Sequence, residues 1–114
     1  MNRKRIYTLD EREWKPTRED LTVNVFGISL IPTEWTNHKF VLTKVEPGGE
    51  FSHHTDPYHH VFYFINGQGI GWIGDQTYEI KPDLVVEVPS GMVHGYKNNG
   101  DADLMLLTIN IPKT

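Results

Sequence analysis

Histidine is the residue type that dominates the chemistry available to this 114-residue chain. A lone histidine is usually an ordinary hydrogen-bonded side chain, but four fall within the eight residues from 53 to 60. The lone pairs of neutral imidazoles that lie close together stay unbound unless a metal ion or another charged group interacts with them. The clustering of four histidines therefore favours a divalent metal site. The six histidines are His38, His53, His54, His59, His60 and His94.

The spacing within this cluster indicates which side chains can converge. His54 and Asp56 are two positions apart, so on a strand they lie on the same face. Asp56 and Pro57 form a turn-prone pair, and a turn there would bring His60 back on the neighbouring strand. These three side chains are the first candidates for ligands.

The same odd-even rule separates neighbouring residues. His53 and His59 have the opposite parity to His54 and His60, so at most one of each adjacent pair should reach an ion. We expect His53, His59 and His38 to be dispensable for metal binding. Phe62 and Phe64 share the parity of His60, which predicts that they line the interior beside it, although ordinary core packing would explain them equally well.

The chain contains no cysteine. This excludes disulfides, a thiolate nucleophile and zinc sites of the finger type. Histidine and carboxylate remain as the metal ligands.

Two motifs carry a resemblance to a known family. The run Gly48-x5-His54-x-Asp56-x3-His60-x6-Gly67 resembles the first motif of the cupin superfamily, G-x5-H-x-H-x3,4-E-x6-G. The run Asp83-x5-Pro89-x-Gly91-x2-His94-x3-Asn98 resembles the second, G-x5-P-x-G-x2-H-x3-N. Fifteen residues, 68–82, separate them, a spacing similar to that of small single-domain bacterial cupins. The resemblance covers about residues 36–112.

The resemblance implies one divalent metal ion on His54, Asp56, His60 and His94, with Tyr96 sharing the parity of His94 in the pocket wall. The carboxylate stands in the second ligand place rather than the third, so Asp56 binds either directly or through water. Iron, manganese, nickel, cobalt and zinc all suit imidazole with carboxylate. Three neutral imidazoles and one carboxylate leave a charge near +1, which attracts small anionic, oxygen-rich compounds. Four ligands in an octahedral field would leave two adjacent positions for a chelating substrate.

The chain pattern predicts an all-β fold. Short apolar runs are broken by turn residues every eight to twelve positions, and the best helix candidate, residues 11–20, contains Pro16. Asn66-Gly67 predicts a type I′ hairpin. With the cupin motifs, the expected architecture is a double-stranded β-helix (jelly-roll) barrel of two antiparallel sheets at 36–112, preceded by an N-terminal arm and first strands at 1–35, docked through Trp14. The expected strands are 21–26, 40–45, 61–65, 69–73, 77–80, 84–88, 94–97 and 104–111.

Two of these strands, 61–65 and 104–107, are apolar on both faces. A strand that is half exposed to water should alternate polar and apolar residues. In so short a chain, another subunit is the expected cover for the second face. We therefore expect a homodimer.

Charge and hydropathy limit the partners. The net charge is −4, and the basic cluster Arg3-Lys4-Arg5 is confined to the terminus, so we expect no nucleic-acid partner. No apolar run approaches the roughly 20 residues of a membrane span, and the N-terminus lacks a signal-peptide pattern. The expectation is a cytoplasmic protein that does not bind membranes.

Two functions fit these observations. The first is a mononuclear metalloenzyme of dioxygenase, isomerase or lyase type that acts on a small anionic organic compound. The alternative is a non-catalytic cupin that binds or senses a small molecule. A sensor normally carries an output domain, and none is visible in the sequence, which favours the enzyme.

Overall fold

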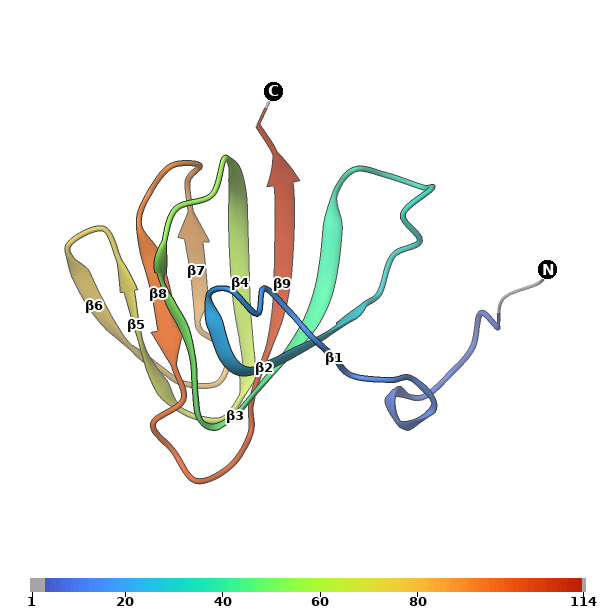
Figure 1. Cartoon of the computed structure of the whole chain (residues 1–114), viewed down its shortest axis with the longest axis horizontal. Helices are drawn as coiled ribbons and strands as arrows, with labels where there is room; N and C mark the ends of the chain where they lie inside the picture. The colour runs from blue at the N-terminus through green and yellow to red at the C-terminus, as the bar shows by residue number, and fades with distance from the viewer. Residues whose placement is uncertain (1–3, 114) are drawn as a thin grey trace.

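The computed structural model describes residues 4–113, and within them the chain is built almost wholly of β-strands (Figure 1). The all-β prediction is confirmed, since the helical element of this part is the three-residue 3-10 segment η1 (Leu9–Glu11). Arg3 of the basic cluster and the start of the predicted arm lie outside the described residues. The strands are β1 (Lys15–Pro16), β2 (Thr22–Ser29), β3 (Lys39–His54), β4 (Tyr58–Asn66), β5 (Gly69–Ile73), β6 (Gln76–Ile80), β7 (Val85–Val88), β8 (His94–Lys97) and β9 (Leu104–Pro112).

Every strand pair is antiparallel, and the long β3 joins two sheets into a curled jelly-roll barrel (Figure 1). The first part of β3, residues 39–45, pairs with β9, which continues to β4 and β7. The last part, from Glu50 to His54, pairs with β8, which continues to β5 and β6. The two halves of the barrel thus share one strand, and the end of that strand carries His54.

Two local predictions were wrong. Pro47-Gly48-Gly49 does not end a strand: β3 runs through it, and Gly48 has a φ of 80° that favours glycine. Residues 11–20, the best helix candidate despite Pro16, contain no α-helix, and the chain is extended at β1. Asn66-Gly67 does not close a hairpin, since β4 pairs with β7 and β9 while β5 pairs with β6 and β8. This segment instead carries the chain from one sheet to the other.

The N-terminal arm is attached to the barrel by strand pairing and by an aromatic contact. β1 pairs with β2, with Pro16 opposite Phe26. The ammonium group of Lys44 on β3 lies 4.7 Å from the centre of the Trp14 ring. Such cation–π contacts contribute about 0.5–1 kcal/mol at exposed sites.

The core lies between the two sheets and is formed by inward-facing residues of alternating parity. Phe62 and Phe64 of β4 contribute two aromatic rings, which meet Tyr96 of β8 at centroid distances of 5.6 and 6.1 Å. The buried cluster comprises Val25, Val45, Phe62, Phe64, Ile80, Val86, Val88, Tyr96, Leu104 and Leu106.

The outer face of the β7–β4–β9 sheet keeps apolar side chains in contact with solvent. Tyr63 and Ile65 on β4 are 38% and 36% exposed, and Val85, opposite Tyr63 on β7, is 53% exposed. Tyr63 and Ile65 belong to the strand whose second face we expected another subunit to cover.

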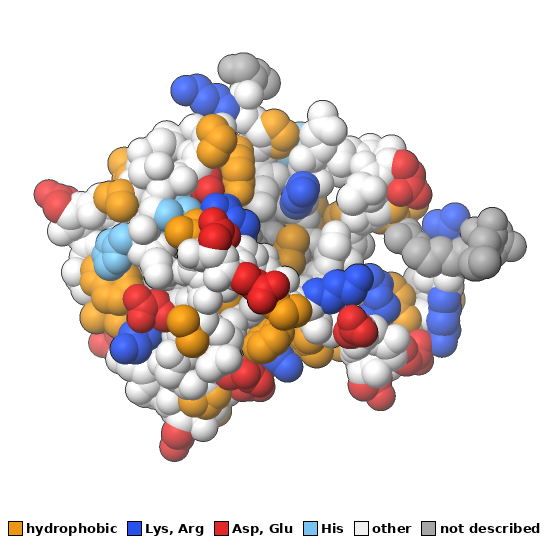
Figure 2. Space-filling model, in the orientation of Figure 1, with side chains coloured by type: hydrophobic (Ala, Val, Ile, Leu, Met, Phe, Trp, Pro, Cys, Tyr) orange, Lys and Arg blue, Asp and Glu red, His pale blue; other side chains and the backbone are white. Residues whose placement is uncertain are grey.

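Charged side chains of both signs are interspersed over the face shown in Figure 2, where no continuous basic area is seen. Within residues 4–113, no helix has the length and apolar character needed to cross a membrane.

Candidate metal centre

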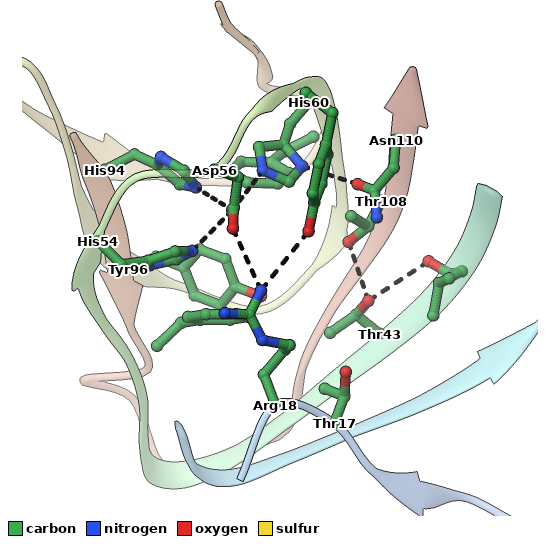
Figure 3. A pocket seen from close by; sticks show the side chains of 14 residues that line it. Thr17, Arg18, Thr43, His54, Asp56, His60, His94, Tyr96, Thr108 and Asn110 are labelled. Carbon is green, nitrogen blue, oxygen red and sulfur yellow. Dashed lines mark hydrogen bonds and ion pairs between the residues drawn. The ribbon is translucent and has the colours of Figure 1, made fainter. Parts of the chain in front are cut away.

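Three histidines and one aspartate converge inside one end of the barrel (Figure 3). His54 is the last residue of β3, and it stands directly opposite His94, the first residue of β8. His60 comes from β4, and Asp56 lies in the turn between β3 and β4. Asp56 Oδ2 lies 2.9 Å from Nε2 of His54, 2.8 Å from Nε2 of His60 and 3.6 Å from Nε2 of His94.

Each imidazole is oriented by a carbonyl oxygen at its other nitrogen. Nδ1 of His54 donates to the Ser52 carbonyl at 2.7 Å, and Nδ1 of His94 donates to the Met92 carbonyl at 2.9 Å. Because a carbonyl oxygen can only accept, the proton of each neutral ring resides on Nδ1.

His60 follows the same arrangement through a side chain. Its Nδ1 donates to Oδ1 of Asn110 at 2.7 Å. All three Nε2 atoms are thereby available as lone-pair donors that point toward one place. Outer partners of this kind fix ring orientation and raise the basicity of histidine ligands in metal sites.

The ionisation states favour a cation at this place. Burial opposes the charge on Asp56, but the close contacts with His60 and Arg18 outweigh it and lower the pKa of the carboxyl group. Burial lowers the pKa of His94 to about 4, so its ring is neutral near pH 7. Asp56 Oδ2 lies close to all three Nε2 atoms, and lone pairs on both sides of such a contact repel unless a proton or a metal ion lies between them.

The donor set fits a divalent transition metal. Ligand distances of about 2.0–2.2 Å would put neighbouring donor atoms about 3 Å apart. The separations from Asp56 Oδ2 to the three Nε2 atoms, 2.8 to 3.6 Å, are close to this value. His54, Asp56 and His94 form a group that can hold a metal ion, with ligand atoms within 4.8 Å of one another.

The other histidines lie elsewhere. His53 packs its ring on Trp72 at a centroid distance of 4.7 Å. Nδ1 of His59 accepts a hydrogen bond from the backbone N–H of Ser90. His38 Nδ1 is 3.0 Å from the Thr36 hydroxyl. The structure therefore separates the four expected ligands from these three rings, as parity predicted for His53 and His59.

A cavity of about 70 Å³ adjoins the centre. Phe62 and Tyr96 line it, as expected. Phe64 is fully buried and is not one of the lining residues, because it lies further along β4 in the core. Polar side chains of β3 and β9 also line the cavity, including Thr43 and Thr108, whose hydroxyl groups are 2.9 Å apart.

Sequence reasoning missed Arg18 and Tyr58. Nη1 of Arg18, from the N-terminal arm, lies 3.2 Å from Asp56 Oδ1 and 3.5 Å from the Tyr58 hydroxyl (Figure 3). It also missed Asn110, which stands opposite His60 in the β4–β9 register. Arg18 stood in a run of mixed charge with no motif, and Asn110 is placed only by strand register.

Comparisons with known proteins agree with this geometry. A family model described as a cupin domain matches residues 41–110. Comparison with curated proteins found no match. Among solved structures, a predicted oxalate decarboxylase from Thermotoga maritima is 25% identical, with a TM-score of 0.73 over 78% of this chain and 81% of that chain.

Two further solved structures show the fold alone. The polyketide cyclase RemF from Streptomyces resistomycificus is 20% identical, with a TM-score of 0.82 over 99% of this chain and 80% of that chain. KdgF from Halomonas sp. is 14% identical, with a TM-score of 0.76 over 94% of each chain.

Proposed function

This chain belongs to the cupin domain family, and we propose that it is a mononuclear metalloenzyme that acts on a small organic acid. His54, Asp56, His60 and His94 would hold one divalent ion. The observation that carries the proposal is the common orientation of the three imidazoles, each with Nδ1 hydrogen-bonded to a carbonyl oxygen and Nε2 directed toward the Asp56 carboxylate.

Imidazole and carboxylate ligands suit iron, manganese, nickel, cobalt and zinc. A bound ion of this kind supplies Lewis acidity, and iron or manganese also supplies redox chemistry. The chain's own residues orient the ligand atoms, exclude water with Phe62 and Tyr96, and confine the substrate to the adjoining cavity.

The charge and size of the site select the substrate class. One divalent ion with one carboxylate and three neutral rings leaves a charge near +1, which favours an anion. The cavity of about 70 Å³ holds only a small molecule, since drug-sized ligands occupy roughly 300–1,000 Å³. The likeness to a predicted oxalate decarboxylase supports a short carboxylic acid as substrate.

The test is reconstitution of metal-free protein with iron, manganese, nickel, cobalt and zinc separately. Each form is then assayed against short hydroxy, oxo and dicarboxylic acids, with and without dioxygen. Turnover with one metal is the expected result. Tight reversible binding of one acid without turnover under any condition would contradict the enzyme and favour a sensing cupin.

A further inference from the structure

We propose that Arg18 binds the carboxylate of the substrate and is the residue by which this pocket selects short carboxylic acids. The inference rests on the proposed function and deepens it, because it names the group that the acid meets beside the metal. Arg18 is a specificity-determining residue in this account rather than a metal ligand.

Arg18 supplies the positive charge of the cavity wall. Among the described residues that line the cavity, it is the only lysine or arginine. Its side chain is 39% exposed, so a ligand in the cavity can reach the guanidinium group. The other carboxylate and imidazole groups that line the cavity are Asp56 and the three histidines of the centre.

The guanidinium group is only partly engaged. Nη1 serves both Asp56 and Tyr58, and Nε lies 3.7 Å from Asp20. Within residues 4–113, no side-chain hydrogen bond or ion pair involves Nη2 of Arg18. Arginine presents its N–H groups as a planar fork that matches a carboxylate. The unused arm of this fork can therefore donate to a bound anion.

The backbone around Arg18 is held in a specific conformation. Arg18 has a φ of 47°, in the left-handed region that residues other than glycine rarely adopt. Its carbonyl accepts from the N–H of Leu21 at 2.7 Å, and the preceding Thr17 donates its N–H to Val25 at 3.1 Å. The Thr22 hydroxyl donates to the Thr17 carbonyl at 2.7 Å. An unfavourable conformation that neighbouring hydrogen bonds maintain is characteristic of functional positions.

The arm that presents Arg18 is anchored by the residues just before it. β1 pairs with β2 just before Arg18, and Trp14 packs against Lys44. A side chain that is positioned before the ligand arrives loses little conformational freedom on binding. The arm therefore supplies a preorganised cation that reaches toward Asp56 in the cavity that Thr43 and Thr108 also line (Figure 3).

Arg18 also changes the charge of the site. With a divalent ion, one carboxylate and one guanidinium, the sum rises from +1 to +2. A dianion such as oxalate neutralises that charge, and a monoanion such as lactate reduces it to +1. One water molecule needs about 10–15 Å³ of cavity volume. The cavity of about 70 Å³ therefore has room for roughly five to seven non-hydrogen atoms, each about the size of a water. Acids of two to four carbons, such as oxalate and lactate, fit this limit.

The experiment compares R18Q with R12Q in calorimetric titrations with oxalate, lactate and the neutral analogue lactamide. Arg12 is a matched control, since it lies in the same arm but packs on Tyr7 and does not line the cavity. We expect R18Q to weaken oxalate and lactate binding by at least about tenfold, and R12Q by less than about twofold. Lactamide affinity should be the same in both variants, and R18K should be intermediate because it keeps the charge without the fork.

Metal content is measured in the same samples. R18Q should hold as much metal as the wild type, whereas loss of metal from R18Q would show that Arg18 only positions Asp56 and would overturn the proposal. Equal oxalate affinity of R18Q and R12Q would also overturn it. If the wild type holds no metal, the proposed function fails, and titration of the metal-free proteins then decides on Arg18: tighter oxalate binding by wild type than by R18Q supports it, and equal or absent binding overturns it.

Discussion

His60 donates its Nδ1 proton to the side-chain oxygen of Asn110 across 2.7 Å, and the two residues stand directly opposite each other in the pairing of β4 with β9. His54 and His94 are oriented by backbone carbonyls, which no substitution removes. Of the three imidazoles of the centre, His60 is the one whose Nδ1 bonds to a side chain rather than to the backbone. Asn110 is therefore the position at which the orientation of a ligand can be tested without changing a ligand.

The substitution Asn110→Leu should lower metal affinity by about 10–100-fold, because His60 loses the acceptor that fixes its tautomer and ring plane. Asn110→Asp keeps an acceptor oxygen and should retain most of the affinity. Asn99→Leu, at an exposed position outside the centre, is the control. Competition with a chromophoric chelator measures all three, and an unchanged affinity in Asn110→Leu would contradict the role given to this hydrogen bond.

The metal-free protein should lose stability as the pH falls from about 6.5 to about 4. Burial lowers the pKa of His94 from its usual 6.5 to about 4, so in this window the unfolded chain binds a proton that the folded chain does not. The contribution of His94 to the free energy of unfolding is complete above the pKa that His94 has in the unfolded chain, and it decreases below that pH. Urea unfolding of metal-free protein across this range measures the slope.

His94→Gln provides the comparison for this pH series. The variant should lose less stability than the wild type between pH 6.5 and 4, because glutamine does not titrate. The lowered pKa of Asp56 acts in a different window, below its usual 3.8, and so does not confuse the comparison. Identical slopes for the wild type and His94→Gln would show that His94 is not buried in its neutral form.

Gly71→Ala should destabilise the barrel by about 1–3 kcal/mol, the usual range for overpacking. A Cβ added at Gly71 would overlap the ring of Tyr78 on the paired strand β6, and that ring packs on Phe64 at 6.4 Å. Gly100→Ala meets only the flexible side chain of Gln68 and should cost less. Thermal unfolding measures the stability of the two variants. Equal stabilities would contradict the tight packing at Gly71.

The homodimer remains a prediction, and the exposed apolar face of β4 and β7 is where it can be tested. Val85→Lys places a charge on a side chain that is 53% exposed in the single chain, so it should change folding stability little. In sedimentation equilibrium, the substitution should lower the apparent mass from twice the 13.2 kDa chain mass toward the mass of one chain. A wild type that sediments only as a 13.2 kDa species at micromolar concentration would exclude the dimer.

Sequence patterns predicted the strands and the convergence of the ligands well, because both depend on short-range spacing. His54 and Asp56 share a strand parity, the turn at Asp56-Pro57 returns the chain, and His60 then faces them. The same parity placed Phe62 in the pocket wall. It could not place Phe64, which has the same parity but lies deeper, since depth along a strand depends on how the barrel closes.

The remaining features depend on long-range pairing that no local pattern encodes. Asn66-Gly67 has the composition of a hairpin, yet the two flanking strands belong to different halves of the barrel and each pairs with other partners. Gly48 permits a positive φ and lets β3 bend without ending. Arg18 contacts Asp56 across 38 positions of sequence, and only the docking of the arm brings them together.

The central claim is that one divalent ion is held by His54, Asp56, His60 and His94, and elemental analysis of natively purified protein tests it most directly. The wild type should contain one ion per chain, His54→Ala and His94→Ala should contain almost none, and His53→Ala should match the wild type. His53 is a sharp control, because it is adjacent to His54 but packs on Trp72 outside the centre. A wild type without metal, or a His53→Ala variant that loses the metal while His54→Ala keeps it, would contradict the account.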